Sequence, residues 1–328
     1  MIDEQNLPKD LTRYRGTTPR PKDFDAFWTS RLAEADAVPL EWHICPADVT
    51  SGSSCRFFDF YFTGARGEAM YAKYVCPVVP DNKLVPLVLQ FHGYPGSSRS
   101  WFELASFAGM GCAVLSMDCP NQGGRSRDFS GYAGSLSSGM LIAGLDGDAK
   151  DMYYVRVYQT IRVLCRIVKH LRGIDSARVY VNGGSQGGAL GIVCAALSPE
   201  LIQKASILYP FLSDFQKVWE LGADEIAYEG LRYYTRWFDP LGTRIEEIFT
   251  KLGYVDVIHF APYVRAKVLF GTGLADIVCP PCTQYAVYNN LSCSKRHVLF
   301  DGYGHEEIAP FDDLLPAFYA KEDTLCLQ

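Results

Sequence analysis

A series of short apolar runs, separated by stretches with helical periodicity, constrains the fold of this chain more than any other feature. Each run is bounded by glycine or polar residues and is typical of a strand buried on both faces. Strands that alternate with helices form parallel crossovers, which place helices on both sides of one sheet. The sequence therefore predicts an α/β fold with a doubly wound, mostly parallel sheet. The predicted strands are residues 84–91 (LVPLVLQF), 112–117 (CAVLSM), 177–181 (ARVYV), 204–209 (KASILY), 266–270 (AKVLF) and 296–300 (RHVLF).

Two helices are predicted from the spacing of apolar residues. The first spans residues 20–38, with Pro21 near its first turn and apolar residues along one side. The second spans residues 154–171, where apolar residues recur every three or four positions, and Gly173 ends it. Its polar side is predicted to face away from the core and holds Arg156, Gln159, Arg162, Arg166 and Lys169.

Two further segments complete the predicted architecture. Residues 55–62 (CRFFDFYF) and 69–78 (AMYAKYVCPV) have the aromatic, alternating character of an antiparallel pair of strands. Residues 210–265 interrupt the strand series with aromatic-rich helical segments, where such folds carry a cap over the active site. No Gly/Ser-rich or Pro-rich linker divides the chain, so we expect a single domain over residues 1–328 with a cap-like insertion at 210–265.

Charge and hydropathy argue against two classes of partner. The net charge of −6 and the scarcity of basic clusters argue against binding to nucleic acid, whose phosphates require a positive surface. No apolar run approaches the roughly 20 residues that span a bilayer, so no membrane segment is predicted. Residues 1–16 are charged and lack an apolar signal core, which leads us to expect a cytoplasmic protein.

The 11 cysteines are scattered and odd in number, which is typical of reduced thiols rather than of a disulfide framework. One pair, Cys279 and Cys282, has the C-x-x-C spacing of a redox site or of half a zinc site. A zinc site would require a second pair or nearby histidines at suitable spacing, and none follows. We therefore expect two thiols that line a pocket, and we predict no metal and no cofactor.

The segment GGSQGG, residues 183–188, lies between a predicted strand and the helical sequence that follows Ser185. It matches G-x-S-x-G, the nucleophile elbow, in which a serine occupies a strained turn between a strand and a helix. Glycines at 183 and 187 make room for this turn, Gly184 lets the chain enter it, and Gly188 allows close helix packing. A phosphate-binding loop would require Lys followed by Ser or Thr, which is absent. Ser185 is therefore the candidate nucleophile.

A serine nucleophile requires a histidine base, which in this type of fold lies further along the chain. Three histidines follow Ser185. His259 lies in the insertion, too early in the chain, and His297 begins the last strand, where a structural role is expected. His305 lies in the glycine-flanked loop directly after that strand, and it is the candidate base.

The base in turn requires a carboxylate that orients it. Asp276 lies just past the end of a predicted strand, at the edge of the sheet where catalytic groups gather in open α/β folds. Asp301 is the rival, four residues before His305 on the same loop, and Asp256 is expected at the surface. Asp276 is the candidate acid.

Two backbone N–H groups are expected to form an oxyanion hole. One belongs to Gln186, the residue after the nucleophile, and the other to Tyr94, in the loop after the strand at 84–91. His92 opens this loop, and we expect it to support the loop through hydrogen bonds.

Together these motifs resemble the acetyl xylan esterase and cephalosporin-C deacetylase family of α/β-hydrolases, along nearly the whole chain. The resemblance implies a catalytic triad of Ser185, Asp276 and His305, with Tyr94 and Gln186 as oxyanion donors, in agreement with the assignment from the residues. The matching segments are residues 20–28 (RPKDFDAFW), 91–96 (FHGYPG), 183–188 (GGSQGG), 273–289 (GLADIVCPPCTQYAVYN) and 303–307 (YGHEE).

One segment departs from the family pattern. The family usually has Arg-Gly-Gln after the strand that here ends near Asp118, whereas this chain has Pro120, Asn121 and Gln122. The glutamine keeps its place, and Arg125 is a candidate to replace the missing arginine. The substitution puts the geometry of this loop in question.

The resemblance implies a serine esterase that removes acetyl groups from xylo-oligosaccharides and from small acetate esters such as cephalosporin C. It also implies a ring-like homohexamer with active sites facing an inner cavity. A general short-chain carboxylesterase without sugar preference is the alternative. A peptidase or amidase of the same fold, and a non-catalytic binding protein, are further alternatives.

Overall fold

The computed structural model describes residues 8–223 and 226–320. The expectations for residues 1–7, for the end of the single domain at 321–328 and for positions 224–225 of the insertion lie outside the described residues. Within the described residues, no helix is both long and apolar enough to span a membrane.

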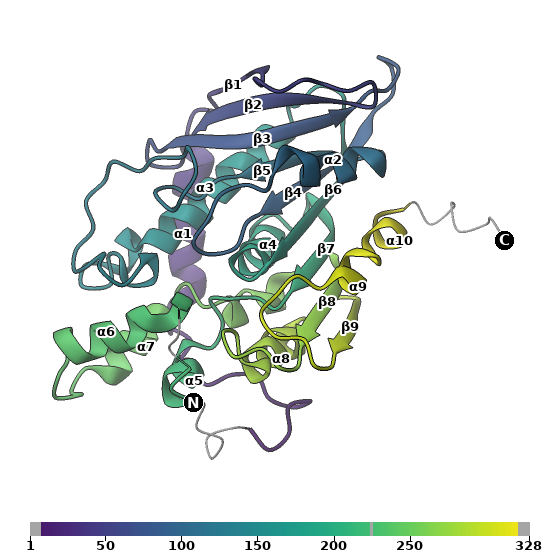
Figure 1. Ribbon diagram of the computed structural model, residues 1–328. Coiled ribbons are helices and arrows are strands. Elements are labelled where there is room, and N and C mark those ends of the chain that lie inside the picture. Colours follow the sequence, from purple (N-terminus) through teal and green to yellow (C-terminus); the bar gives the residue numbers. More distant parts are fainter. Residues whose placement is uncertain (1–7, 224–225, 321–328) are drawn as a thin grey trace.

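The described part of the chain forms one nine-stranded sheet in the order β1-β2-β3-β5-β4-β6-β7-β8-β9 (Figure 1). β1, β2, β3 and β5 pair antiparallel in turn, whereas β5, β4, β6, β7, β8 and β9 pair parallel. The predicted mostly parallel sheet with an antiparallel pair is confirmed. The strands are β1 Trp42–Pro46, β2 Cys55–Thr63, β3 Ala69–Pro77, β4 Val85–Phe91, β5 Ala113–Met117, β6 Ile174–Gly184, β7 Ile202–Leu208, β8 Lys267–Gly273 and β9 Lys295–Phe300.

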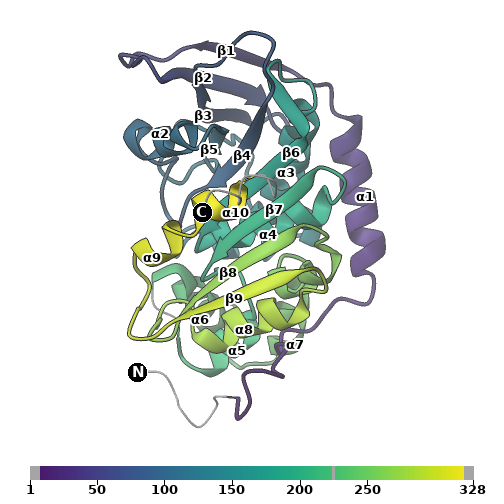
Figure 2. The same cartoon turned by 90° about the vertical axis from the view of Figure 1, so that its right-hand side faces the viewer.

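Helices cover both faces of this sheet, as predicted (Figure 2). α1, α3, α4 and α8 contribute to the larger core on one face, whereas α2, α9 and α10 pack on the other. The α-helices are α1 Phe24–Ala37, α2 Trp101–Gly109, α3 Tyr153–Val168, α4 Gln186–Leu197, α5 Phe215–Glu220, α6 Glu229–Phe238, α7 Ile245–Leu252, α8 Pro281–Asn290, α9 Ala309–Asp312 and α10 Leu315–Tyr319. Short 3-10 turns are η2 Met140–Ile142, η3 Ala149–Asp151, η4 Ile226–Tyr228, η5 Val257–His259 and η6 Ala261–Tyr263.

The sequence analysis did not predict β1, and it placed the limits of β6 too narrowly. β1 is a five-residue edge strand of the sheet, and none of its side chains is fully buried, so its sequence lacks the pattern of a buried strand. β6 extends on both sides of residues 177–181 because it pairs with β4 and β7 up to Gly183 and Gly184.

The predicted outward face of α3 is wrong in part, because Arg156 and Gln159 are buried. Gln159 is covered by α1, which packs across α3 from a distant part of the sequence (Figure 1). The amide of Gln159 donates to the main-chain oxygen of Arg31 and to the carboxylate of Glu34, at 2.9 Å each. The guanidinium of Arg156 lies 3.5 Å from the carboxylate of Asp128.

Residues 210–265 hold α5, α6, α7 and three 3-10 turns, and α6 and α7 project from one end of the sheet (Figure 1). Their role as a cap stays a prediction. Asp256 was expected at the surface, and this is wrong: its side chain is fully buried. Its carboxylate accepts the N–H groups of Asp214, Phe215 and Ile258, so it holds the start of α5 against η5. Burial and the neighbouring Asp214 raise the pKa of Asp256 to about 7.

Candidate active site

Ser185 lies between the end of β6 and the first turn of α4, with φ of 57° and ψ of −124°. A positive φ is rare outside glycine and marks a strained backbone. The predicted strand–turn–helix context of this serine is therefore present.

The glycines around Ser185 are required by close backbone contacts. A Cβ atom on Gly183 would lie 2.3 Å from the main-chain carbon of Gly187, and one on Gly187 would lie 2.0 Å from the main-chain oxygen of Phe91. On Gly188 it would lie 2.9 Å from the main-chain oxygen of Leu208. No side chain fits at 183 or 187, in agreement with the space that the elbow was predicted to need.

The structure brings Ser185, His305 and Asp276 together in one hydrogen-bonded chain. Nε2 of His305 lies 2.9 Å from Oγ of Ser185, and its Nδ1 lies 2.9 Å from Oδ2 of Asp276. These residues are contributed by the β6–α4 turn, the loop after β9 and the loop after β8. The arrangement allows the imidazole to take a proton from the serine while the carboxylate holds its other nitrogen.

Asp276 is almost fully buried, and its position is fixed by several donors. One oxygen accepts the N–H groups of Val278 and Cys279 at 2.9 and 2.8 Å. The other accepts the amide of Gln284, from α8, at 3.2 Å, in addition to His305. Gln284 was not identified from the sequence, because it lies in the first turn of α8, eight residues after Asp276, and belongs to no recognisable motif.

Tyr209 is a second contact that sequence reasoning missed. Its ring centre lies 4.6 Å from that of His305, and its hydroxyl donates to the main-chain oxygen of Glu306 at 2.7 Å. Tyr209 follows β7 with a positive φ of 31°, and it packs the histidine loop against the sheet edge.

The rival residues lie elsewhere. Asp301 is exposed and takes no part in the hydrogen-bonded chain. Nε2 of His297 shares a hydrogen bond of 2.9 Å with the Thr272 hydroxyl, and its ring stacks on Tyr288, so it is structural as expected. His259 packs on Phe24 through an edge-on ring contact. Burial lowers the pKa of both histidines to about 4.

His92 supports the loop after β4, as predicted. Its Nε2 accepts the N–H of Cys119 at 2.9 Å, so its Nδ1 carries the proton and donates to the main-chain oxygen of Gly93 at 2.7 Å. Burial lowers the pKa of His92, which keeps the ring neutral.

The two predicted oxyanion donors lie on backbone segments that border Ser185. Gln186 begins α4 directly after the serine. On Gly93, which precedes Tyr94, a Cβ atom would lie 4.0 Å from the Cβ of Ser185, so this loop passes beside the nucleophile. Among the described residues, no hydrogen bond uses the N–H of Tyr94 or that of Gln186. Both groups are therefore free to bind an oxygen atom.

Gln122 holds the side chain of Gln186 in place. The two amides donate to each other, and the hydroxyl of Tyr154 donates to the Gln186 oxygen at 2.8 Å. The Gln186 amide also donates to the main-chain oxygen of His92 at 3.3 Å. Gln122, the residue that matches the family pattern in the segment 120–122, thus connects the loop after β5 to Gln186 and, through Gln186, to Tyr154 and the loop that begins at His92.

The other residues of the departing segment form a closed loop. Asn121 adopts a positive φ of 60°, and its side chain bonds to the N–H and main-chain oxygen of Asp128. The carboxylate of Asp118 accepts the N–H groups of Ser98 and Arg125 at 2.7 Å each. The guanidinium of Arg125 lies 3.1 Å from the carboxylate of Asp59, so Arg125 binds to strand β2 rather than to the neighbouring loops.

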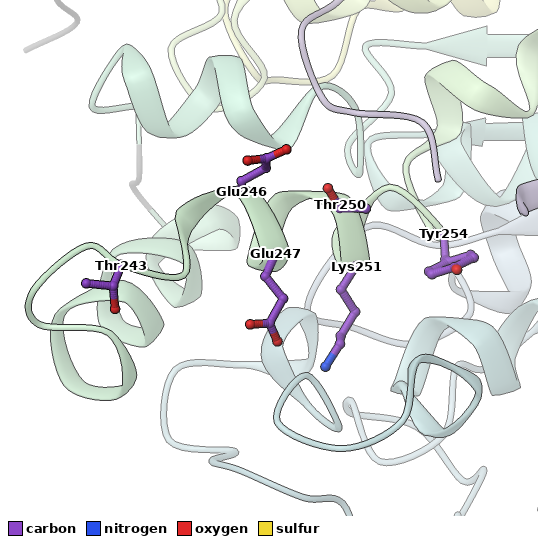
Figure 3. A pocket seen from close by; sticks show the side chains of 6 residues that line it. All are labelled: Thr243, Glu246, Glu247, Thr250, Lys251 and Tyr254. Carbon is purple, nitrogen blue, oxygen red and sulfur yellow. The ribbon is translucent and has the colours of Figure 1, made fainter. Parts of the chain in front are cut away.

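One hollow borders the elbow, and another lies along α7. The first, of about 860 Å³, borders the elbow through Gly93, Gly184 and Tyr209 and is otherwise lined largely by α2, α9 and α10. The other lies along α7 and is shown in Figure 3. There Lys251 donates to the main-chain oxygens of Leu145 and Gly147, so its ammonium holds α7 to a neighbouring loop. Neither hollow is lined by Ser185, Asp276 or His305.

Both the sequence and the fold of this chain are similar to those of known proteins. The family model "Acetyl xylan esterase (AXE1)" matches residues 4–322. The crystal structure of acetyl xylan esterase 1 from Thermoanaerobacterium sp. JW/SL YS485 superposes with a TM-score of 0.92 and 38% sequence identity, over 95% of this chain and 98% of that one. The acetyl xylan esterase from Paenibacillus sp. R4 gives a TM-score of 0.90 and 30% identity, over 95% and 99% of the two chains.

A curated relative, acetyl esterase Axe7A from Xylanibacter ruminicola, is 27% identical over 300 residues, or 86% of this chain. The chain spans 63% of the length of that relative. The family match covers nearly all of the sequence, and the two solved structures share its α/β-hydrolase fold from end to end. The chain belongs to the acetyl xylan esterase family.

Proposed function

We propose that this protein is a serine esterase that releases acetate from acetylated sugars and small acetate esters. The observation that carries the proposal is the hydrogen-bonded chain from Ser185 through His305 to Asp276. The proposal that the acyl group is acetyl is supported by three relatives, which are named as an acetyl esterase and two acetyl xylan esterases.

The proposed reaction is acyl transfer through a covalent intermediate. His305 takes the proton of Ser185, whose oxygen attacks the acetyl carbonyl. The resulting oxyanion binds the N–H groups of Tyr94 and Gln186, each worth roughly 3–4 kcal/mol in the transition state. His305 then protonates the departing alcohol, and Asp276 stabilises the imidazolium. Water activated by the same histidine releases acetate and restores the serine.

Acetylated xylo-oligosaccharides and cephalosporin C are the proposed substrates, and a short-chain carboxylesterase without sugar preference is the second candidate. Relative rates on acetylated xylose and on simple aryl acetates separate the two. An acetyl-sized site also requires 4-nitrophenyl acetate to react faster than the butyrate and octanoate esters. Equal rates on all three chain lengths contradict it.

We further propose a homohexamer in the cytoplasm that admits only small esters to its active sites. Light scattering of the purified protein measures the assembly, and a monomeric mass contradicts this part. No metal or cofactor takes part in the proposed reaction.

Ser185→Ala tests the core of the proposal. We expect the variant to remain folded and to lose nearly all hydrolysis of 4-nitrophenyl acetate. A fluorophosphonate probe should label the parent protein at Ser185 and leave the variant unlabelled. A variant that retains the parental rate, or a parent that resists labelling, contradicts a serine nucleophile.

A further inference from the structure

A cysteine lies beside the acid and the base of the proposed triad. The donor atoms of Asp276, Cys279 and His305 all lie within 4.8 Å of one another. Within the part of the chain that the structure describes, this is the one group of three such side chains close enough to share a metal ion.

The local chain geometry brings these groups together. Asp276 accepts the N–H of Cys279, which curls the segment after β8 and returns the cysteine toward the carboxylate. The amide of Gln284 donates both to Oδ2 of Asp276 at 3.2 Å and to the main-chain oxygen of Cys279 at 2.6 Å. Hydrogen bonds of this kind, from residues that do not themselves bind the metal, hold the metal ligands in position and are typical of metal sites.

We propose that Asp276, Cys279 and His305 form an inhibitory binding site for a thiophilic divalent cation such as Zn²⁺ or Cd²⁺. Carboxylate oxygen, thiolate sulfur and imidazole nitrogen are ordinary ligands of tetrahedral zinc, at about 2.0–2.3 Å from the metal. Ligand atoms on one such ion lie about 3.5 Å apart, so the three donors reach a common ion with shifts of about 1 Å. Water takes the fourth position.

When the metal binds, the thiol of Cys279 loses its proton to solvent and becomes the thiolate ligand. Nδ1 of His305 binds the metal, and its proton moves to Nε2. The dication, the carboxylate and the thiolate then sum to zero charge, which suits a site in which Asp276 and Cys279 are buried.

Inhibition of ester hydrolysis follows from the same proton shift, and it rests on the proposed function. With a proton on Nε2, His305 cannot accept the proton of Ser185, so the nucleophile is not activated. Because a thiolate ligand favours soft cations, Mg²⁺ and Ca²⁺ should not inhibit.

Binding is tested without reference to activity in a Ser185→Ala background. Titration with Cd²⁺ should produce the ultraviolet absorption of a cadmium–thiolate bond and saturate at one equivalent. Adding Cys279→Ser or Cys279→Ala should weaken this binding at least tenfold, and so should Asp276→Asn. Cys282→Ser is the matched control, three residues away, and should leave the titration unchanged. Equal titrations with and without Cys279, measured on variants with parental circular dichroism, overturn the proposal.

Inhibition is tested in the parent protein. Zn²⁺ should inhibit the parent and Cys282→Ser alike, and EDTA should restore both. Cys279→Ser should require at least tenfold more Zn²⁺ for half-inhibition of its own remaining activity; an unchanged requirement overturns the proposal. If the parent releases no acetate, the proposed function fails, while the Cd²⁺ titration still decides whether the metal site exists.

Discussion

The side-chain amides of Gln122 and Gln186 bond to each other in both directions, with N···O distances of 2.8 and 3.0 Å. Gln122 lies in the loop after β5, and Gln186 directly follows the candidate nucleophile. This pair therefore connects the segment that departs from the family pattern to one of the two predicted oxyanion donors.

Gln122→Leu should lower kcat about tenfold and leave KM nearly unchanged. The substitution removes two hydrogen bonds from the fully buried amide of Gln186, which keeps its bonds to Tyr154 and His92, and a lost hydrogen bond costs roughly 0.5–1.5 kcal/mol. The lost stabilisation affects mainly the transition state, because the residue that shifts is Gln186, whose backbone N–H is the predicted oxyanion donor. Steady-state kinetics on 4-nitrophenyl acetate measure it. The kcat of Gln122→Glu, whose carboxylate still accepts a hydrogen bond from Gln186, should lie between those of the parent and Gln122→Leu. A parental kcat in Gln122→Leu contradicts a role for Gln122 in positioning Gln186.

Asp276→Asn should reduce kcat by roughly 10³–10⁴-fold, while Asp301→Asn should leave it unchanged. Only the first removes the acceptor that holds Nδ1 of His305 and stabilises the imidazolium. Both aspartates precede the same histidine in the sequence, so the second variant is a matched control. A loss of activity in Asp301→Asn with full activity in Asp276→Asn would reverse the assignment.

The sequence was most informative where local backbone chemistry dictates residue type. GGSQGG predicted the turn around Ser185 because the space at Gly183 and Gly187 admits no side chain. The sequence was uninformative where the burial of a side chain depends on packing against residues that are distant along the chain. Gln159 and Asp256 looked like surface residues because the partners that bury them, α1 and the start of α5, lie far away along the chain. Gln284 and Tyr209 belong to no motif, and only the fold brings them to Asp276 and His305.

Gly187→Ala should destabilise the protein by about 3 kcal/mol or more, because its Cβ would lie 2.0 Å from a main-chain oxygen that has no room to move. In Gly191→Ala, one helical turn further along α4, the new Cβ meets the methyl end of the flexible Ile207 side chain at 2.8 Å and is in ordinary contact with Val181 at 3.7 Å. Alanine also has the higher helix propensity, so this control should change stability by about 1 kcal/mol or less. Denaturant unfolding compares the two. Equal stabilities would contradict the close contact between α4 and β4.

His259→Phe should reduce the sensitivity of the fold to acid. Burial lowers the pKa of His259 from 6.5 to about 4, so between these values the unfolded chain binds a proton that the folded chain does not. The contribution of His259 to the free energy of unfolding is therefore fully present above pH 6.5 and decreases as the pH falls. At pH 5 the decrease is about 2 kcal/mol.

Asp256 acts in the opposite direction, because its raised pKa makes the folded chain bind the extra proton as the pH falls through about 7. The slope of one protein alone thus mixes these two groups with His297, whose pKa burial also lowers to about 4, whereas the difference between parent and His259→Phe isolates His259. Unfolding free energies at pH 7 and pH 5 give this difference. The parent should lose about 2 kcal/mol more than the variant on acidification. Equal losses in both would show that His259 gains its proton as readily in the folded chain as in the unfolded one.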